Sequence, residues 1–146
     1  MRHTKAEIYL HFVWATEKRE PLLIPEVERS VYHCIQNEAV RLRCVVMAMG
    51  GMPDHVHLLV RVPTRVSAAS LANQVKGVSS HFVHQQLKGL EHFQWQEGYG
   101  VFSISRSHVR RVAAYVKNQK LHHTNSTLWP EWEETDEETV LDGEQT

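Results

Sequence analysis

Two histidines separated by one apolar residue, His55-Val56-His57, are the side chains best placed by type and spacing to do chemistry. Residues two apart point the same way in a β-strand, because successive side chains alternate between its faces. The surrounding residues alternate in the same way, and the apolar face comprises Val56, Leu58, Val60 and Val62. Two imidazoles on the other face could bind one metal ion through neutral nitrogens. The spacing fits two surface histidines equally well, so a metal site needs partners elsewhere in the chain.

A second group of polar side chains lies in the segment 107–122, where Val109, Val112, Ala113 and Val116 recur at helical spacing. Ser107 is expected to cap the start of this helix. Tyr115 and Gln119 are four residues apart and would therefore be neighbours on the helix surface. They could simply belong to an amphipathic surface. Alternatively, Tyr115 supplies a phenolic nucleophile, and the Gln119 carbonyl oxygen completes the metal site begun by the two histidines.

The elements that must position these groups follow from the periodicity of the chain. Strands are expected at 7–16, 44–49, 56–62 and 98–105, and helices at 25–42, 68–87 and 107–122. Gly50, Gly51 and Pro53 are expected to form a turn, and the 68–87 helix to bury Leu71, Val75, Val78 and Phe82. The order of the first six elements predicts an α+β, ferredoxin-like (split βαβ) fold, which RNA recognition motifs share. It has one antiparallel four-stranded sheet with two helices on one face, and here an additional C-terminal helix.

Charge is distributed unevenly along the 146 residues, although the net charge is only −1. Residues 131–146 contain eight acidic residues and no Lys or Arg, which leaves residues 1–130 with 16 basic and nine acidic residues, a net charge of +7. We expect one domain over 1–130 and a flexible acidic tail over 131–146. A basic body fits a polyanionic partner such as nucleic acid, although such a surplus can also serve solubility alone.

The remaining composition favours a cytoplasmic protein. Cys34 and Cys44 are too few for a disulfide framework and are expected to be buried, reduced thiols. No apolar run approaches the length of a membrane span, and the first residues lack the layout of a secretory signal. We therefore expect no membrane partner.

Four segments occur in an order and spacing that resemble a known family. They are MPDHVHLLVRV (52–62), QVKG (74–77), WQEGYGVFSIS (95–105) and YVKNQ (115–119) followed by His122-His123. Together they resemble the single-tyrosine HUH transposases of the insertion-sequence-200/605 type, over about Tyr9 to Trp129. The resemblance implies that His55 and His57 bind a divalent metal, Mg²⁺ or Mn²⁺, that Gln119 is a third ligand, and that Tyr115 is the catalytic nucleophile.

The resemblance also implies a function and partners. The expected protein is a DNA transposase that cleaves and rejoins single-stranded DNA with hairpin ends through a 5′-phosphotyrosine intermediate. It would act as a homodimer in which the tyrosine helix of one subunit can complete the metal site of the other. Further candidate ligands or DNA contacts are His11, His122 and His123. The candidate DNA-binding side chains are Arg61, Arg65, Lys76, Arg106, Arg110 and Arg111.

Two other functions remain open. One is a domesticated relative that acts on repetitive palindromes with the same chemistry. The other is a non-catalytic module that binds single-stranded nucleic acid, since the same sheet topology also serves RNA recognition. The feature that separates the second from an enzyme is the pair Tyr115 and Gln119 beside the two histidines, which binding alone does not require.

Overall fold

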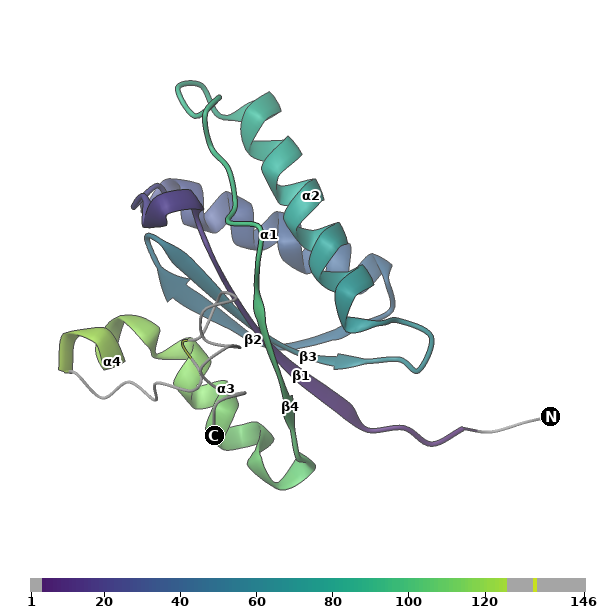
Figure 1. Ribbon diagram of the computed structural model, residues 1–146. Coiled ribbons are helices and arrows are strands. Elements are labelled where there is room, and N and C mark those ends of the chain that lie inside the picture. Colours follow the sequence, from purple (N-terminus) through teal and green to yellow (C-terminus); the bar gives the residue numbers. More distant parts are fainter. Residues whose placement is uncertain (1–3, 126–132, 134–146) are drawn as a thin grey trace, which may run out of the picture.

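The computed structural model describes residues 4–125 and Glu133. Its centre is an antiparallel sheet of β1 (Ile8–Ala15), β2 (Val45–Met52), β3 (His55–Val62) and β4 (Gly100–Ile104), in the order β2-β3-β1-β4. Helices α1 (Pro25–Arg41) and α2 (Ala68–Gln86) cover one face, and α3 (Val109–Lys117) and α4 (Gln119–Asn125) lie on the other (Figure 1). Two short 3₁₀ helices, η1 (Glu17–Arg19) and η2 (Arg106–His108), follow β1 and β4. The predicted ferredoxin-like fold is confirmed.

The main core lies between the sheet and the α1–α2 layer. The apolar face predicted for β3 packs there as expected, together with Phe12 and Trp14 of β1, which have no exposed surface. The Trp95 and Trp14 rings form a T-shaped pair with 5.8 Å between ring centroids, and the Trp95 indole donates to Ser79 Oγ at 2.9 Å. These contacts tie the segment before β4 to β1 and to α2.

A second, smaller core lies on the opposite face, where the β3 histidines project. Its buried members are Ala48, Leu59, Val112 and Val116, so α3 packs directly on β2 and β3. Gly50 makes that approach possible, because a Cβ atom at this position would lie 2.0 Å from the Val116 carbonyl oxygen. The close contact fixes the height of α3 above the histidines.

Two predicted local features are wrong. Gly50 and Gly51 lie inside β2, and the turn to β3 is made by Pro53 and Asp54. Strand pairing overrides the turn tendency here, because both glycines are needed for close packing: a Cβ on Gly51 would meet the His55 carbonyl oxygen at 2.2 Å. In α2 the buried side chains are Leu71, Ala72, Val75, Ser79 and Val83. Val78 and Phe82 are only half-buried, since they face the groove between α2 and α1 rather than the sheet.

The C-terminal helix also differs from the prediction. It is divided at Asn118, which has φ −102° and ψ 29°, into α3 and α4. Ser107 lies within η2 rather than at the helix N-cap, and its hydroxyl contacts His108 Nδ1 at 3.2 Å. Cys44 is buried as predicted, whereas Cys34 is half-buried. No helix in the described ranges has the length and apolar character needed to cross a bilayer. The predicted flexibility of the tail concerns residues outside those ranges, Glu133 excepted.

Candidate active site

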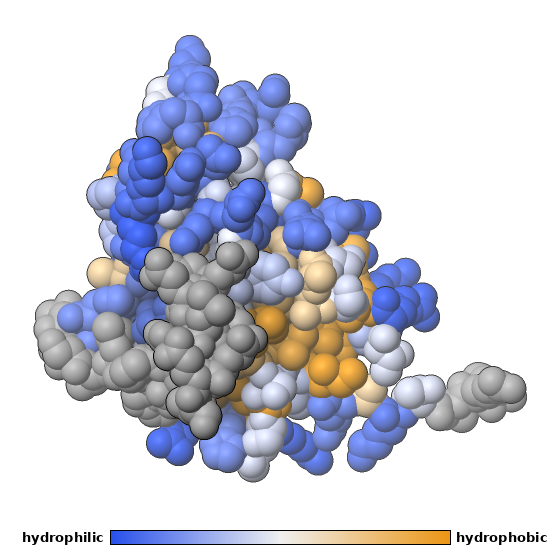
Figure 2. Space-filling view, in the orientation of Figure 1, coloured by the Kyte–Doolittle hydropathy of each residue, from blue (hydrophilic) through white to orange (hydrophobic). Residues whose placement is uncertain are grey.

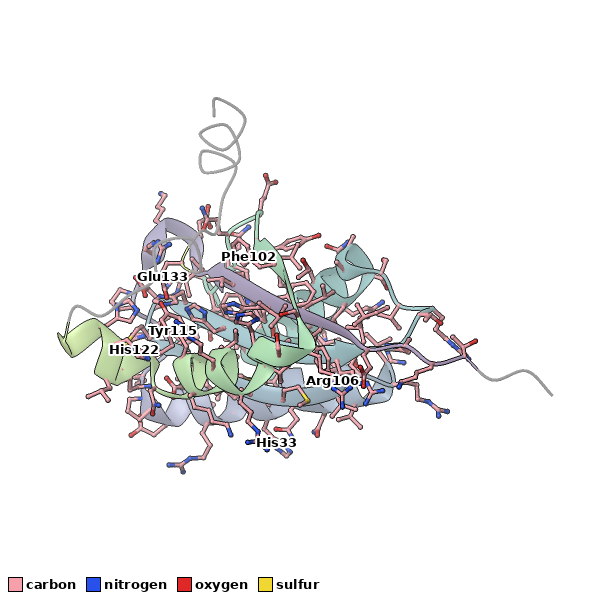
Figure 3. All side chains as sticks on the ribbon, turned by 90° about the horizontal axis from the view of Figure 1, so that it is seen from below. His33, Phe102, Arg106, Tyr115, His122 and Glu133 are labelled. Carbon is pink, nitrogen blue, oxygen red and sulfur yellow. The ribbon has the colours of Figure 1, made fainter. Side chains whose placement is uncertain are left out.

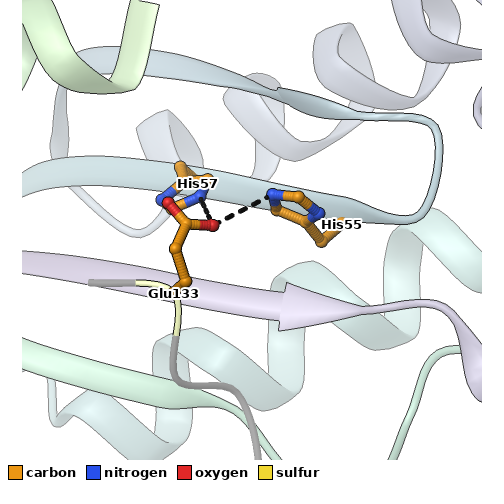
Figure 4. A group of neighbouring side chains, drawn as sticks. All are labelled: His55, His57 and Glu133. Atoms are coloured by element: carbon orange, nitrogen blue, oxygen red, sulfur yellow. Dashed lines mark hydrogen bonds and ion pairs between the residues drawn. The ribbon is translucent and has the colours of Figure 1, made fainter. Parts of the chain in front are cut away.

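His55 and His57 lie side by side on the face of β3 that α3 covers. Their side chains are almost completely buried, and their ring centroids are 5.2 Å apart. Both Nε2 atoms face one carboxylate oxygen, Oε1 of Glu133, at 3.3 Å from His55 and 3.1 Å from His57 (Figure 4). The alternation of the strand therefore brings the two imidazoles to one point, as the spacing predicted.

Each imidazole is oriented by a contact at its other nitrogen. His55 Nδ1 lies 2.7 Å from Asp54 Oδ1, and Asp54 in turn pairs with Arg19 at 3.7 Å. His57 Nδ1 lies 2.8 Å from Nε2 of His11, a buried residue of the neighbouring strand β1. Contacts of this kind fix the ring and direct the free nitrogen of a metal-binding histidine toward the ion. The geometry leaves both Nε2 atoms available as ligands.

Helix α3 and the start of α4 bring the second half of the candidate site to the histidines. Tyr115 is buried, its ring edge-on to His57 at 6.0 Å between centroids and stacked on His122 at 4.6 Å. Gln119 is completely buried, and its Oε1 lies 3.4 Å from His55 Nε2 and 3.2 Å from His123 Nε2. The four residues named as catalytic or metal-binding in the sequence thus converge within one chain.

Glu133 is a residue of this cluster that the sequence analysis missed. Its Oε1 faces the histidines, and its Oε2 accepts a hydrogen bond from the Tyr115 hydroxyl. In the sequence it is one of eight acidic residues in the segment 131–146, which was expected to be a flexible tail, so its residue type did not distinguish it from its neighbours. The available signal was its neighbour Trp132, a large apolar residue that could anchor the acidic segment to the body. Tyr115, His122 and Glu133 lie together at one end of the sheet in Figure 3.

The electrostatics of the cluster depend on this carboxylate. Burial opposes ionisation of Glu133, but hydrogen bonds from His55 and His57 outweigh it and hold the pKa of the carboxyl well below its usual range. Burial likewise disfavours a charged His55, but hydrogen bonds to Asp54 and Glu133 outweigh it and raise the His55 pKa to about 9. Burial lowers the pKa of His57, and burial with the neighbouring His57 lowers that of His11 to about 3. Without a cation, the positive charge of the cluster therefore resides on His55.

The donor set fits a divalent cation. Nε2 of His55, Nε2 of His57 and a carboxylate oxygen of Glu133 lie within 4.8 Å of one another, and the Gln119 oxygen lies beside them. Imidazole nitrogens suit zinc and other transition metals, whereas amide and carboxylate oxygens suit magnesium and manganese. The arrangement can therefore hold a cation next to a phenol.

Two of the candidate DNA-binding side chains, Arg61 and Arg106, lie away from the cluster. Arg61 donates to the Ala6 carbonyl oxygen at 3.0 Å and lies four residues from His57 along β3, about 13 Å away. Arg106 lies at the opposite end of the sheet from Tyr115 in Figure 3 and pairs with Glu7 at 3.6 Å. All five arginine candidates, Arg61, Arg65, Arg106, Arg110 and Arg111, are exposed. All of these remain predictions.

Lys76 differs from the other candidates because its ammonium group already has protein acceptors. Its Nζ donates to the carbonyl oxygens of Gln96, Glu97 and Gly98 at 2.7, 2.9 and 3.2 Å. Its side chain is half-buried, and burial lowers its pKa. This geometry gives Lys76 a role in holding the segment before β4 against α2, and its predicted phosphate contact stays untested.

Comparison with known proteins identifies the family of this chain. The model of a family described as "Transposase IS200 like" matches residues 4–119. The transposase for insertion sequence element IS200 of Salmonella typhimurium is 23% identical over 124 residues, which cover 82% of this chain and 81% of the relative. The ISDra2 transposase TnpA of Deinococcus radiodurans is 22% identical over 118 residues, which cover 77% of this chain and 84% of the relative.

Solved structures share the fold. A putative transposase from Deinococcus radiodurans R1 superposes with a TM-score of 0.67 at 24% identity, over 82% of this chain and 95% of that one. A REP-associated tyrosine transposase bound to a REP hairpin gives a TM-score of 0.64 at 17% identity, over 84% of this chain and 73% of that one. Because the family match extends from before β1 through α3 to Gln119, the chain belongs to the family of IS200-like transposases.

Proposed function

We propose that the protein cleaves and rejoins single-stranded DNA in a metal-dependent reaction, with Tyr115 as the nucleophile. The phenolic oxygen attacks the phosphorus of a scissile phosphodiester, forms a 5′-phosphotyrosine and expels a 3′ hydroxyl. A later attack by another 3′ hydroxyl releases Tyr115 and rejoins the strands. The bond energy is kept in the covalent intermediate, so rejoining needs no ATP.

In this proposal His55, His57 and Gln119 hold a divalent cation, Mg²⁺ or Mn²⁺. When bound, the cation withdraws the charge that develops on a non-bridging phosphate oxygen. The protein itself contributes by holding the Tyr115 hydroxyl in position for attack. A phenol with a pKa of about 10 is a poor nucleophile at neutral pH unless it is held next to its target. Burial of Tyr115 between His57 and His122 restricts its ring to one orientation.

The observation that carries the proposal is the convergence of Tyr115 with both histidines in one chain. His57 and Tyr115, which are 58 positions apart in the sequence, meet because β3 presents the imidazoles to the face on which α3 packs. A module that only bound nucleic acid would not need a buried phenol beside buried imidazoles. The same geometry supports catalysis within a single subunit, without exchange of the tyrosine helix.

The test is a search for the covalent intermediate. A single-stranded oligonucleotide with an element's terminal hairpin is incubated with the full-length protein and Mn²⁺ and resolved on a denaturing gel. Wild-type protein should give a protein–DNA adduct that EDTA abolishes and that Tyr115→Phe lacks. Tyr99→Phe is the matched control, because Tyr99 packs on the main core, away from the cluster face. The Tyr99→Phe protein should therefore still form the adduct. An adduct in Tyr115→Phe would refute the role of Tyr115, and DNA binding without cleavage or metal uptake would favour the binding module.

Hairpin-ended single strands are the proposed substrate. The REP-associated tyrosine transposase whose fold resembles that of this chain was solved bound to a REP hairpin. That likeness also favours the second candidate, a domesticated enzyme that acts on repetitive palindromes. The two are separated by comparing adduct formation on terminal hairpins of an insertion sequence with that on dispersed genomic palindromes.

A homodimer is the proposed assembly. Strand β4 lies at the edge of the sheet and pairs with β1 on its inner side. Apolar surface is visible along β4 in Figure 2, and the exposed large apolar side chains of β1 and β4 are Ile8 and Val101. An exposed apolar edge strand favours pairing with another chain. Light scattering on the full-length protein should give twice the 16.9 kDa mass, and the single mass would refute the dimer.

A further inference from the structure

Glu133 joins the two halves of the candidate site, because one of its oxygens faces the histidines and the other meets the nucleophile. We propose that Glu133 is an additional ligand of the divalent cation through Oε1 and positions the Tyr115 hydroxyl through Oε2. This inference rests on the proposed function. It assigns to a residue of the acidic C-terminal segment a part in the catalytic centre.

The spacing of the donor atoms is that of ligands around an ion. With metal–ligand distances of about 2.0–2.2 Å, adjacent ligand atoms in tetrahedral or octahedral geometry lie about 3–3.5 Å apart. Oε1 of Glu133 lies 3.1 Å from His57 Nε2 and 3.3 Å from His55 Nε2. Gln119 Oε1 lies 3.4 Å from the same His55 atom. Glu133 therefore completes a group of four donors that needs little rearrangement to surround a cation.

Charge supports the same assignment. Two neutral imidazoles and an amide oxygen contribute no net charge to a bound cation. Hard divalent cations such as Mg²⁺ and Mn²⁺ prefer carboxylate oxygens to such neutral donors. Glu133 supplies the carboxylate from a half-buried position, with 17% of its side chain exposed, so the charge is only partly screened by solvent.

The second oxygen explains how the nucleophile is aligned. The Tyr115 hydroxyl donates to Oε2, which directs its hydrogen toward the carboxylate and leaves the oxygen lone pairs for a phosphorus atom. The other oxygen of the same carboxylate faces the Nε2 atoms of the histidines. The separation between the two carboxylate oxygens therefore sets the distance between the nucleophile and the cation. Alignment of this kind is worth orders of magnitude in rate, because small displacements of reacting groups are costly.

Metal affinity provides a test that needs no catalysis. Binding of Mn²⁺ to the full-length protein, without DNA, is measured by calorimetry for the wild type, Glu133→Gln and Glu134→Gln. Glu134→Gln removes the same charge at the next position and is the matched control. Glu133→Gln should bind Mn²⁺ about 10- to 100-fold more weakly, whereas Glu134→Gln stays within about twofold of wild type. Equal affinities in all three proteins would overturn the ligand role.

Adduct formation at saturating Mn²⁺ tests the positioning role. Glu133→Gln should form the Tyr115 adduct at least about tenfold more slowly, and Glu133→Asp, which keeps the carboxylate, should recover part of the rate. A Glu133→Gln protein that binds Mn²⁺ normally and forms the adduct faster would overturn the inference and show that the carboxylate only blocks the phosphate position.

His57→Ala separates failure of the inference from failure of the proposed function. If His57→Ala loses Mn²⁺ affinity while Glu133→Gln keeps it, the metal site stands without Glu133. If the wild type neither binds Mn²⁺ nor forms an adduct, the proposed function itself fails. Thermal unfolding of each variant verifies that the fold is retained.

Discussion

Gly50 controls how closely α3, which carries Tyr115, approaches the sheet that carries the histidines. A Cβ at Gly50 would lie 2.0 Å from the Val116 carbonyl oxygen, where ordinary contact begins at 3.4 Å. Gly50→Ala must therefore move the helix backbone by about 1.4 Å, a shift directly next to Tyr115. Overpacking of this kind costs about 1–3 kcal/mol. A displacement of about 1 Å at reacting groups can lower a rate about 100-fold.

The assay combines thermal unfolding with the rate of adduct formation on a hairpin oligonucleotide. Gly50→Ala should lower the Tm by about 2–12 °C, at about 2–4 °C per kcal/mol for a domain of this size, and slow the adduct about 100-fold. Gly77→Ala is the matched control, because a Cβ there meets nothing within 4 Å. It should raise the stability by about 0.5–1 kcal/mol, since alanine is the better helix residue, and leave the rate unchanged. A Gly50→Ala protein with wild-type Tm and rate would refute the close packing of α3 on β2.

Two further predictions test the surroundings of the site. Lys76→Met removes three hydrogen bonds from an ammonium group to carbonyl oxygens, so it should lower the free energy of unfolding by about 1–3 kcal/mol in a denaturant titration. Unchanged stability with weaker single-strand DNA binding would instead assign Lys76 to phosphate contact. Asp54→Asn removes the carboxylate at His55 Nδ1, so in metal-free protein the His55 pKa should fall from about 9 toward 6.5, measured by NMR. Because the folded-state pKa is raised, protonated His55 stabilises the fold fully below pH 6.5 and loses that contribution as the pH rises through about 9. A His55 pKa unchanged in Asp54→Asn would contradict the assigned cause.

Local sequence patterns determined the elements and the fold class. Period-two alternation in 55–62 placed His55 and His57 on the face away from the main core, and helical spacing placed Val112 and Val116 on a packing face. Local patterns failed where packing overrode them. Gly50 and Gly51 looked like a turn, yet they lie in β2 because α3 and the β3 backbone leave no room for a side chain.

His55, His57, Tyr115 and Gln119 could be singled out from the sequence by their residue types, by their spacing and by the resemblance of their segments to a known family. Their convergence, and the arrival of Glu133 between them, was decided by the tertiary structure alone. The physical reason is that alternation and helical periodicity report which face a side chain occupies, whereas contacts between distant segments depend on how those faces are stacked. An acidic residue in a run of acidic residues has no pattern of its own, so only its position beside buried imidazoles reveals a role.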